Sequence, residues 1–563
     1  MRCLLRELHR TAGLFSVVLL TWLFGIGSTP AAAATCASLA GLALPDTTIT
    51  AAEPVAAGTY TAPDGEVFAN LPAFCRIAAT LTPTSDSNIK IEVWMPYSGW
   101  NGRFLGTGNG NLGGLIVYAA LAGFLRFGNY AVANTDMGTS PAATDPLGGR
   151  VLTGHPERQT DYGTRSTYLM TVRSKRIIEA FYEQRPNYSY FFGCSTGGGQ
   201  GIHEALQFPG DYDGIVARAP GMNITHNAAA NMWDNQAFNG PANITATQAM
   251  AISAAVVKQC AGKDGGLSSD NFLTDPRDCH WDPAALQCNG GAADAATCLT
   301  APQVAAMRKF YKGPINPRTG KRIYAGRTRG SESNSGYPAT LASLARTTGS
   351  WVFGNDFDPL TFDFDHDMDT IDTALAARLN ANTADLEEFK SHGGKLLLFH
   401  SFADPMIPTL NTIAYYERLI ASQTREGRHD ERKRKEDLHR TQEFARLFLQ
   451  PGVAHCTGGA GPDSADLLSP LVQWVEQGIA PDQIVASKIV DGVTTFTRPL
   501  CPYPGLPRYS GAGDPTKASS FACVADSDHD DNQPPAPKYL NDRDNYPIVP
   551  IDDRDHGRDH DKG

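Results

Sequence analysis

The sequence predicts an α/β fold in which a parallel sheet is covered by helices on both faces and interrupted by one large insertion. Strand-like apolar segments alternate with helical patterns, as in the helix expected at 161–182 and the strand expected at 188–192. This alternation favours parallel strands joined by crossover helices. Residues 220–389 are instead polar and rich in Gly, Asn and Ala, and strand-like sequence resumes at 395–399. We therefore expect one sheet with strands on both sides of the insertion.

Each expected element has its own pattern. Apolar and polar residues alternate at 89–94, which is typical of a strand, and short apolar runs at 188–192 and 395–399 are typical of buried strands. A helical period predicts the helix at 161–182. The full set of expected strands is 89–94, 103–106, 130–134, 188–192, 212–218, 395–399 and 445–449, with helices at 161–182 and 200–207.

Length and composition indicate the domain organisation. With 563 residues, of which 42% are hydrophobic and 19% charged, the chain can form a large globular domain that carries an insertion. We expect a sheet domain from 35–219 and 390–525, and a lid domain from 220–389. A lid in this position can lie over the carboxyl ends of the strands, where open α/β sheets bind ligands. Residues 425–446 carry eight basic and six acidic residues and predict a solvated helix with ion pairs.

The N-terminus is typical of an exported protein. Three arginines precede an apolar run at about 14–26, and small residues follow up to Ala34. This pattern predicts a signal peptide at 1–34. The apolar run is shorter than the ~20 residues that span a bilayer. We therefore expect a secreted or periplasmic protein with no membrane association after signal removal.

The charge of the chain excludes one class of partner. The formal net charge is −11, so no large basic surface for nucleic acid is indicated. The last segment, 526–563, has eleven Asp against five Lys plus Arg and few large apolar residues. We expect this acidic tail to be disordered. The sequence leaves the oligomeric state open.

The cysteine count also indicates export. Removal of Cys3 with the signal peptide leaves ten of the eleven cysteines. An even number in an exported chain predicts five disulfides in an oxidising compartment.

A G-x-S-x-G motif at Gly193–Gly197 places Ser195 between an expected strand and an expected helix. That context gives the motif its meaning, because a sharp turn there projects the serine hydroxyl above the sheet. In the order typical of α/β-hydrolases, an acid and then a histidine follow, each beyond a strand end. Asp404 and His455 fit these positions. The alternatives are a helix-capping Asp, a surface His, and His400 as a rival base, although His400 precedes the expected acid.

Two cysteines and a glycine-rich loop complete the expected site. Cys194 precedes Ser195 and Cys456 follows His455, so a disulfide between them would tie the serine to the histidine; alternatively each pairs elsewhere, or Cys194 is itself reactive. The oxyanion of an acyl-transfer reaction needs N–H donors, which we expect from Thr196 and from Gly110 in the loop 106–114. This loop lacks the G-K-[ST] ending of a nucleotide-binding loop.

These motifs resemble those of the tannase and feruloyl esterase family, which includes hydrolases of mono(hydroxyethyl) terephthalate. The resemblance extends beyond the Ser195, Asp404 and His455 motifs to 100–104, 154–157, 474–476 and 499–504. It implies an α/β-hydrolase catalytic domain with an inserted lid. It also implies five disulfide pairs: Cys36–Cys75, Cys194–Cys456, Cys260–Cys279, Cys288–Cys298 and Cys501–Cys523.

The resemblance further implies a structural calcium ion in the lid. The family's loop supplies carboxylates and backbone carbonyls, which suit this hard cation. In this chain Ala261 stands where one carboxylate is expected, and Asp270 matches only after two extra residues. The expected ligands are Asp264, Asp270 and the carbonyls of Gly266 and Phe272.

The sequence thus predicts a serine carboxylesterase acting on small aromatic esters such as feruloyl or galloyl esters, with no cofactor for catalysis. The alternatives are a terephthalate monoester or broad-specificity carboxylesterase and, from another class, an inactive binding protein with a hydrolase fold. Trp351, Phe353 and Phe357 are candidates for the walls of an aromatic pocket, or else belong to the core of the lid.

Overall fold

The structure is a computed structural model that describes residues 35–140, 149–289, 296–334, 339–423 and 431–525. The expected signal peptide at 1–34 and the expected acidic tail at 526–563 lie outside the described residues. Within the described ranges, no helix has both the length and the apolar character required to cross a membrane.

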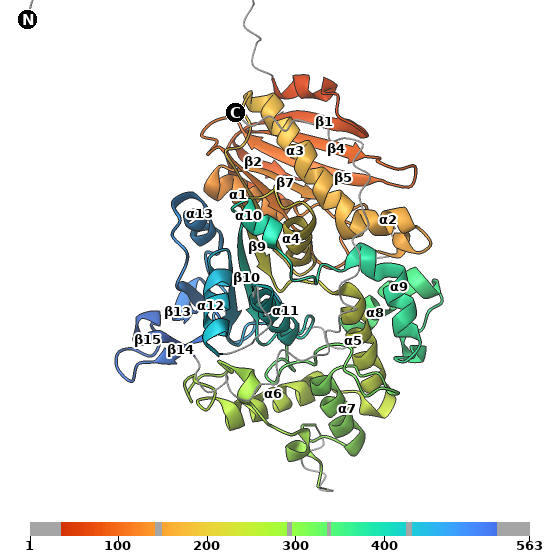
Figure 1. Ribbon diagram of the computed structural model, residues 1–563, viewed down its shortest axis with the longest axis vertical. Coiled ribbons are helices and arrows are strands. Elements are labelled where there is room, and N and C mark those ends of the chain that lie inside the picture. Colours follow the sequence, from red (N-terminus) through yellow and green to blue (C-terminus); the bar gives the residue numbers. More distant parts are fainter. Residues whose placement is uncertain (1–34, 141–148, 290–295, 335–338, 424–430, 526–563) are drawn as a thin grey trace, which may run out of the picture.

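A nine-stranded sheet is the centre of the fold (Figure 1). Its strand order is β1-β4-β5-β7-β6-β8-β9-β10-β11. The strands from β7 through β6 to β11 run parallel, whereas β1, β4, β5 and β7 pair antiparallel. The strands are β1 Thr47–Val55, β4 Phe74–Leu81, β5 Ile89–Pro96, β6 Arg103–Thr107, β7 Ala131–Thr135, β8 Tyr188–Cys194, β9 Gly214–Arg218, β10 Lys395–Ser401 and β11 Ala445–Gln450.

Both faces of the sheet are covered, because successive side chains of a strand point to opposite faces. In β8, Phe191 packs in the cluster that includes residues of α3, α4 and α11, whereas its neighbour Tyr190 packs in the cluster with α1 and α13. The covering helices are α1 Tyr118–Gly128, α3 Ser166–Tyr182, α4 Thr196–Gln207, α11 Thr409–Ser422 and α13 Leu468–Gln477. This architecture confirms the predicted α/β-hydrolase fold class.

The insertion leaves the sheet after β9 and returns at β10, although these two strands are direct neighbours, with Ile215 opposite Leu396. Figure 1 shows its helices as a group beside the sheet. They are α5 Ile224–Ala237, α6 Ala246–Cys260, α7 Ala301–Lys312, α8 Ala339–Phe353 and α9 Asp367–Leu379, and the short α10 Glu387–Ser391 precedes β10. Two apolar clusters outside the sheet stabilise this segment.

Several elements differ from the sequence-based expectation. The antiparallel strands β1 and β4 were not predicted. The helix expected at 161–182 is interrupted: α2 (Pro156–Thr160) continues through a π-helical turn at Asp161–Arg165 into α3. In the charged segment, α12 covers Glu431–Gln442. The unpredicted hairpins are β2 Gly58–Thr61 with β3 Val67–Leu71, β12 Ile484–Val490 with β13 Val493–Leu500, and β14 Gly505–Tyr509 with β15 Phe521–Ala525.

An ion pair joins strand β6 to helix α13. Arg103 of β6 donates two hydrogen bonds to Glu476 of α13, at 2.6 and 2.7 Å, and Tyr190 donates a third at 2.7 Å. The hydrogen bonds from Arg103 hold the pKa of Glu476 below its usual value. The pair thus connects segments 373 residues apart at the edge of the α13 cluster.

We expect Glu476→Gln to lower the free energy of unfolding by about 1–3 kcal/mol at pH 7, because Arg103 would lose its charged partner. A carboxyl group whose pKa is lower in the folded state than in the unfolded state stabilises the folded protein at pH values above its unfolded pKa. This contribution is lost as the pH falls through the folded pKa. The difference from the wild type should therefore shrink below about pH 4. Urea denaturation at several pH values measures it. Glu443→Gln is the exposed control, and an equal loss in both variants would contradict the assignment.

Candidate active site

The candidate catalytic residues follow four parallel strands at one edge of the sheet. The glycine-rich loop follows β6, Ser195 follows β8, Asp404 follows β10 and His455 follows β11. Since parallel strands end at the same edge, side chains far apart in the sequence meet there. The insertion also leaves the sheet at this edge, directly after β9.

The backbone at Ser195 is strained. Its φ of 63° and ψ of −124° lie in a region that non-glycine residues rarely adopt. Three backbone hydrogen bonds hold this conformation: the Ser195 N–H donates to Arg218, and the Ser195 carbonyl accepts from Gly199 and Gly221 at 3.1 and 3.0 Å. A strained serine between a strand and a helix is the geometry that exposes the hydroxyl for attack.

Two glycines allow the tight approach that this turn needs. A Cβ on Gly193 would lie 2.2 Å from the Gly197 carbonyl oxygen, and a Cβ on Gly108 would lie 2.4 Å from the Gly197 Cα. The loop after β6 therefore packs directly on the start of α4. The Gly197 N–H donates to the Asn109 carbonyl at 2.7 Å, and the Thr196 hydroxyl donates to the Asn111 carbonyl.

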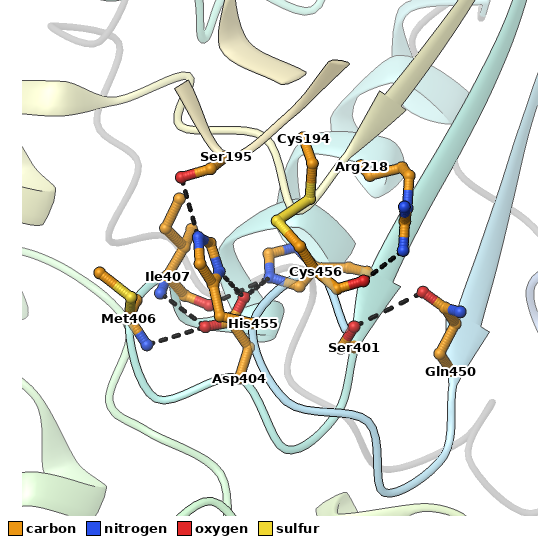
Figure 2. The surroundings of a disulfide bond; sticks show 11 residues. Cys194, Ser195, Arg218, Ser401, Asp404, Met406, Ile407, Gln450, His455 and Cys456 are labelled. Atoms are coloured by element: carbon orange, nitrogen blue, oxygen red, sulfur yellow. Dashed lines mark hydrogen bonds and ion pairs between the residues drawn. A yellow bond between two sulfur atoms is a disulfide. The ribbon is translucent and has the colours of Figure 1, made fainter. Parts of the chain in front are cut away.

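Ser195, His455 and Asp404 form one chain of hydrogen bonds (Figure 2). His455 Nε2 lies 2.8 Å from Ser195 Oγ, and His455 Nδ1 lies 2.7 Å from Asp404 Oδ2. An ionised carboxylate only accepts hydrogen bonds, so His455 Nδ1 carries a proton and donates a hydrogen bond to Asp404. In the neutral ring Nε2 is then the acceptor that faces the serine hydroxyl.

Asp404 is fully buried and ionised. Its Oδ1 accepts the N–H groups of Met406 and Ile407 at 2.8 and 3.0 Å. Burial alone would raise the pKa of Asp404, but the opposing effect of His455, with that of His400, holds it well below its usual range. A carboxylate of this kind keeps its charge beside the imidazole over the whole physiological pH range.

His400 contacts the same carboxylate from the other side. Its Nε2 lies 3.3 Å from Asp404 Oδ2 and 3.0 Å from the Ile407 carbonyl, and its Nδ1 lies 2.7 Å from the Thr412 hydroxyl. The ring is fully buried. These partners occupy both ring nitrogens of His400. His455, and not His400, is therefore the histidine that contacts Ser195.

The disulfide Cys194–Cys456 joins the residue before the serine to the residue after the histidine, with Cα atoms 6.1 Å apart (Figure 2). Arg218 donates to the Cys456 carbonyl and so fixes the same loop. The other four pairs are also those that the family resemblance implies: Cys36–Cys75, Cys260–Cys279, Cys288–Cys298 and Cys501–Cys523.

Two N–H groups, one directly after Ser195 and one in the loop that packs on the start of α4, have no acceptor within the described part of the chain. They belong to Thr196, at the first position of α4, and to Gly110, in the loop after β6. Space beyond Gly110 is open, since a Cβ there would meet nothing within 4 Å. Unpaired N–H groups at a helix start favour negative charge.

A cavity lies between Ser195 and the insertion. Its walls come from the loop after β6, from α5 and α8 of the insertion, and from the loop after Asp404; they include Leu112, Ile224, Leu344, Met406 and Ile407. Trp351, Phe353 and Phe357 are not among the lining residues: they pack in the apolar core of the insertion. The sequence did not indicate which insertion residues face the serine.

The residues expected to bind calcium do not fit that role. Asp264 accepts the N–H groups of Gly262, Gly266 and Thr274, and Asp270 pairs with the guanidinium of Arg498 at 2.8 Å. Calcium requires six to eight oxygen ligands, whereas these carboxylates already have partners and one faces a cation. Over the described ranges, no group of three or more His, Cys, Asp or Glu could hold a metal ion.

The chain matches the family of tannase and feruloyl esterase over residues 75–524. It is 38% identical to an uncharacterized esterase of Xanthomonas campestris pv. campestris, covering 90% of this chain and 94% of that protein. It is 31% identical to the mono(2-hydroxyethyl) terephthalate hydrolase of Piscinibacter sakaiensis, over 84% of this chain and 88% of that protein. The crystal structure of feruloyl esterase B from Aspergillus oryzae superimposes with a TM-score of 0.78 at 28% identity, covering 87% and 99% of the two chains.

Fold and relatives together define a carboxylic ester hydrolase. The chain belongs to the tannase and feruloyl esterase family. The tannin acyl hydrolase of Aspergillus niger shares the fold, with a TM-score of 0.71 at 19% identity.

Removal of the Cys194–Cys456 disulfide, by Cys194→Ser together with Cys456→Ser, should reduce both ester hydrolysis and stability. In the chain-entropy account, loss of a native disulfide costs about 2–5 kcal/mol, and here it also frees the loop that carries His455. Thermal melts and kcat measure the two effects. The control is Cys288→Ser with Cys298→Ser, which opens a loop of sequence separation 10 in the insertion. A similar loss of kcat in both double variants would contradict the special role of the first pair.

Proposed function

We propose that this chain is a secreted or periplasmic serine carboxylesterase that hydrolyses esters of small aromatic acids, such as feruloyl or galloyl esters, through an acyl-enzyme. The observation that carries the proposal is the continuous hydrogen-bond chain from Asp404 through His455 to Ser195. A serine hydroxyl is a weak nucleophile unless a base accepts its proton. In these hydrogen bonds His455 is the base, and Asp404 fixes the tautomer of its ring.

In the first half of the reaction, Ser195 Oγ attacks the ester carbonyl carbon while His455 Nε2 takes the hydroxyl proton. The carbonyl oxygen becomes negatively charged and accepts hydrogen bonds from the N–H groups of Thr196 and Gly110, which have no other acceptor among the described residues. Asp404 stabilises the imidazolium without taking its proton. The tetrahedral intermediate then collapses: the ester C–O bond breaks, His455 protonates the leaving alcohol, and an acyl-Ser195 remains.

In the second half, water replaces the alcohol. His455 takes a proton from the water as its oxygen attacks the acyl carbonyl, and the same N–H groups hold the oxyanion. Collapse breaks the bond to Ser195 Oγ, which recovers its proton from His455. The products are the free aromatic acid and the regenerated serine, and no redox or nucleotide cofactor takes part.

The five disulfides support the proposed compartment, because such bonds persist in oxidising environments outside the cytosol. The aromatic substrate class is supported by the names of the relatives, among them probable feruloyl esterase B-1 of Aspergillus fumigatus at 30% identity. The terephthalate hydrolase of Piscinibacter sakaiensis supports a second candidate, a terephthalate monoesterase.

Hydrolysis of an ester panel by the mature protein tests the proposal. The panel contains methyl gallate, methyl ferulate, methyl caffeate and mono(hydroxyethyl) terephthalate, with Ser195→Ala as the blank. We expect turnover of at least one phenolic ester, reduced by about 10⁴-fold or more in Ser195→Ala. A fluorophosphonate probe should label Ser195 in the wild type. No labelling would contradict the serine mechanism and favour an inactive binding protein.

Asp404→Asn should lower kcat by roughly 10³–10⁴-fold, because an amide no longer selects the tautomer of His455 that accepts the serine proton. Steady-state kinetics on the best ester of the panel measure this. Asp482→Asn is the matched control, since Asp482 is exposed and pairs with Arg446. Thermal melts show whether each variant is folded. A folded Asp404→Asn enzyme with nearly unchanged kcat would show that Asp404 does not orient the base.

A further inference from the structure

Two side chains that line the cavity beside Ser195 each carry one buried polar atom without a well-formed hydrogen bond among the described residues. They are Tyr162, from the π-helical turn before α3, and Asn227, from α5 of the insertion. The Tyr162 hydroxyl and the Asn227 Oδ1 are both closed off from solvent, and within the described ranges neither has a partner with full hydrogen-bond geometry, although the Thr196 side chain interacts with the Tyr162 hydroxyl. A buried polar group without a partner costs stability, so its retention at a ligand cavity needs an explanation.

The π-helical turn determines where Tyr162 lies. An extra residue in a helical turn redirects the following side chains, and such turns are frequent at functional sites. The ring of Tyr162 packs edge-on against Trp351, and its side chain is only 3% exposed. The neighbouring Thr196 hydroxyl donates to the Asn111 carbonyl. Burial raises the pKa of Tyr162, an effect that Thr196 only partly opposes, so the hydroxyl stays protonated at neutral pH.

Asn227 contrasts with Asn231, one helical turn further along α5. Both line the cavity. Asn231 Oδ1 accepts a hydrogen bond from Arg327 at 2.9 Å, whereas Asn227 Oδ1 accepts none within the described residues. Asn227 is therefore an amide of the cavity whose oxygen has an unused hydrogen-bonding capacity in the described part of the chain.

The remainder of the cavity is suited to an uncharged ring. Most of its other walls are apolar, and no lysine or arginine occurs among the described residues that line it. Arg327 lies behind Asn231, where Asp234 neutralises it at 3.2 Å. A carboxylate bound here would have no cationic partner, and burying an unpaired charge is strongly unfavourable.

We propose that Tyr162 and Asn227 determine specificity by binding ring hydroxyl groups of the acyl part of the substrate. An aryl hydroxyl both donates and accepts, so it can donate to Asn227 Oδ1 and accept from the Tyr162 hydroxyl. The cavity therefore selects uncharged hydroxylated aryl acids over terephthalate monoesters. This inference rests on the proposed function and narrows its substrate class.

Paired esters test the inference. Methyl gallate is compared with methyl benzoate, and methyl ferulate with methyl cinnamate, so that the ratio of kcat/KM within a pair reports recognition of the ring substituents. Monomethyl terephthalate tests a charged ring. The enzymes are the wild type, Tyr162→Phe and Asn227→Leu. The matched control is Tyr415→Phe, which removes another buried hydroxyl without a partner in the described chain, outside the lining of the cavity.

We expect the wild type to favour at least one hydroxylated ester over its counterpart by about 10-fold or more, and to hydrolyse monomethyl terephthalate least well. Tyr162→Phe and Asn227→Leu should each reduce that preference by about 10-fold, whereas Tyr415→Phe should keep it. Because Tyr162→Phe removes only a hydroxyl that has no well-formed hydrogen bond among the described residues, it should fold, and a thermal melt checks this.

Other results overturn the inference. These are a wild type without preference for hydroxylated rings, one that favours monomethyl terephthalate or hydrolyses none of the esters, or variants that keep the wild-type preference. Failure of the proposed function has a separate signature: Ser195→Ala would retain hydrolysis, or the fluorophosphonate probe would not label Ser195. A labelled Ser195 with an unchanged preference in both cavity variants leaves the mechanism standing and removes only the assigned specificity.

Discussion

The hydrogen bonds from Asp404 through His455 to Ser195 form only if three loops lie within hydrogen-bonding distance of one another. These loops follow the parallel strands β8, β10 and β11. Backbone hydrogen bonds and a disulfide hold these loops in place. Met406 and Ile407 N–H groups fix the carboxylate, and the Cys194–Cys456 disulfide fixes the histidine loop to the serine turn. Strain at Ser195 is tolerated because the neighbouring strands and glycines determine its position.

The insertion completes the site from the outside. It leaves the sheet between two strands that are direct neighbours, so its length does not disturb their pairing. Helices α5 and α8 cover the serine from the insertion, and Asn227 of α5 lines the same cavity as Tyr162 from the π-helical turn before α3. The sheet thus positions Ser195, Asp404 and His455, whereas a separate segment of the chain supplies much of the cavity wall beside Ser195.

The loop that the family resemblance associates with calcium has a different basis for its stability here. Arg498 reaches Asp270 from β13, and three N–H groups satisfy Asp264. A guanidinium and backbone amides can neutralise buried carboxylates as a cation would. Ala261, the position that departs from the family pattern, lies in the same segment, and the Cys260–Cys279 disulfide closes it.

The sequence by itself determined the parallel strands, the order of Ser195, Asp404 and His455, and the residues next to them, because these depend on local patterns and on spacing relative to strand ends. The antiparallel strands β1 and β4 escaped prediction, since their assignment depends on pairing with other strands rather than on a local pattern. Only the tertiary structure decided that His400 lies behind Asp404, that Arg498 faces Asp270, and that the expected aromatic walls belong to the insertion's core. It also decided that Tyr162 and Asn227 line the cavity beside Ser195. Such contacts join residues from separate elements, and no local periodicity encodes which side chains of an insertion will meet a sheet edge.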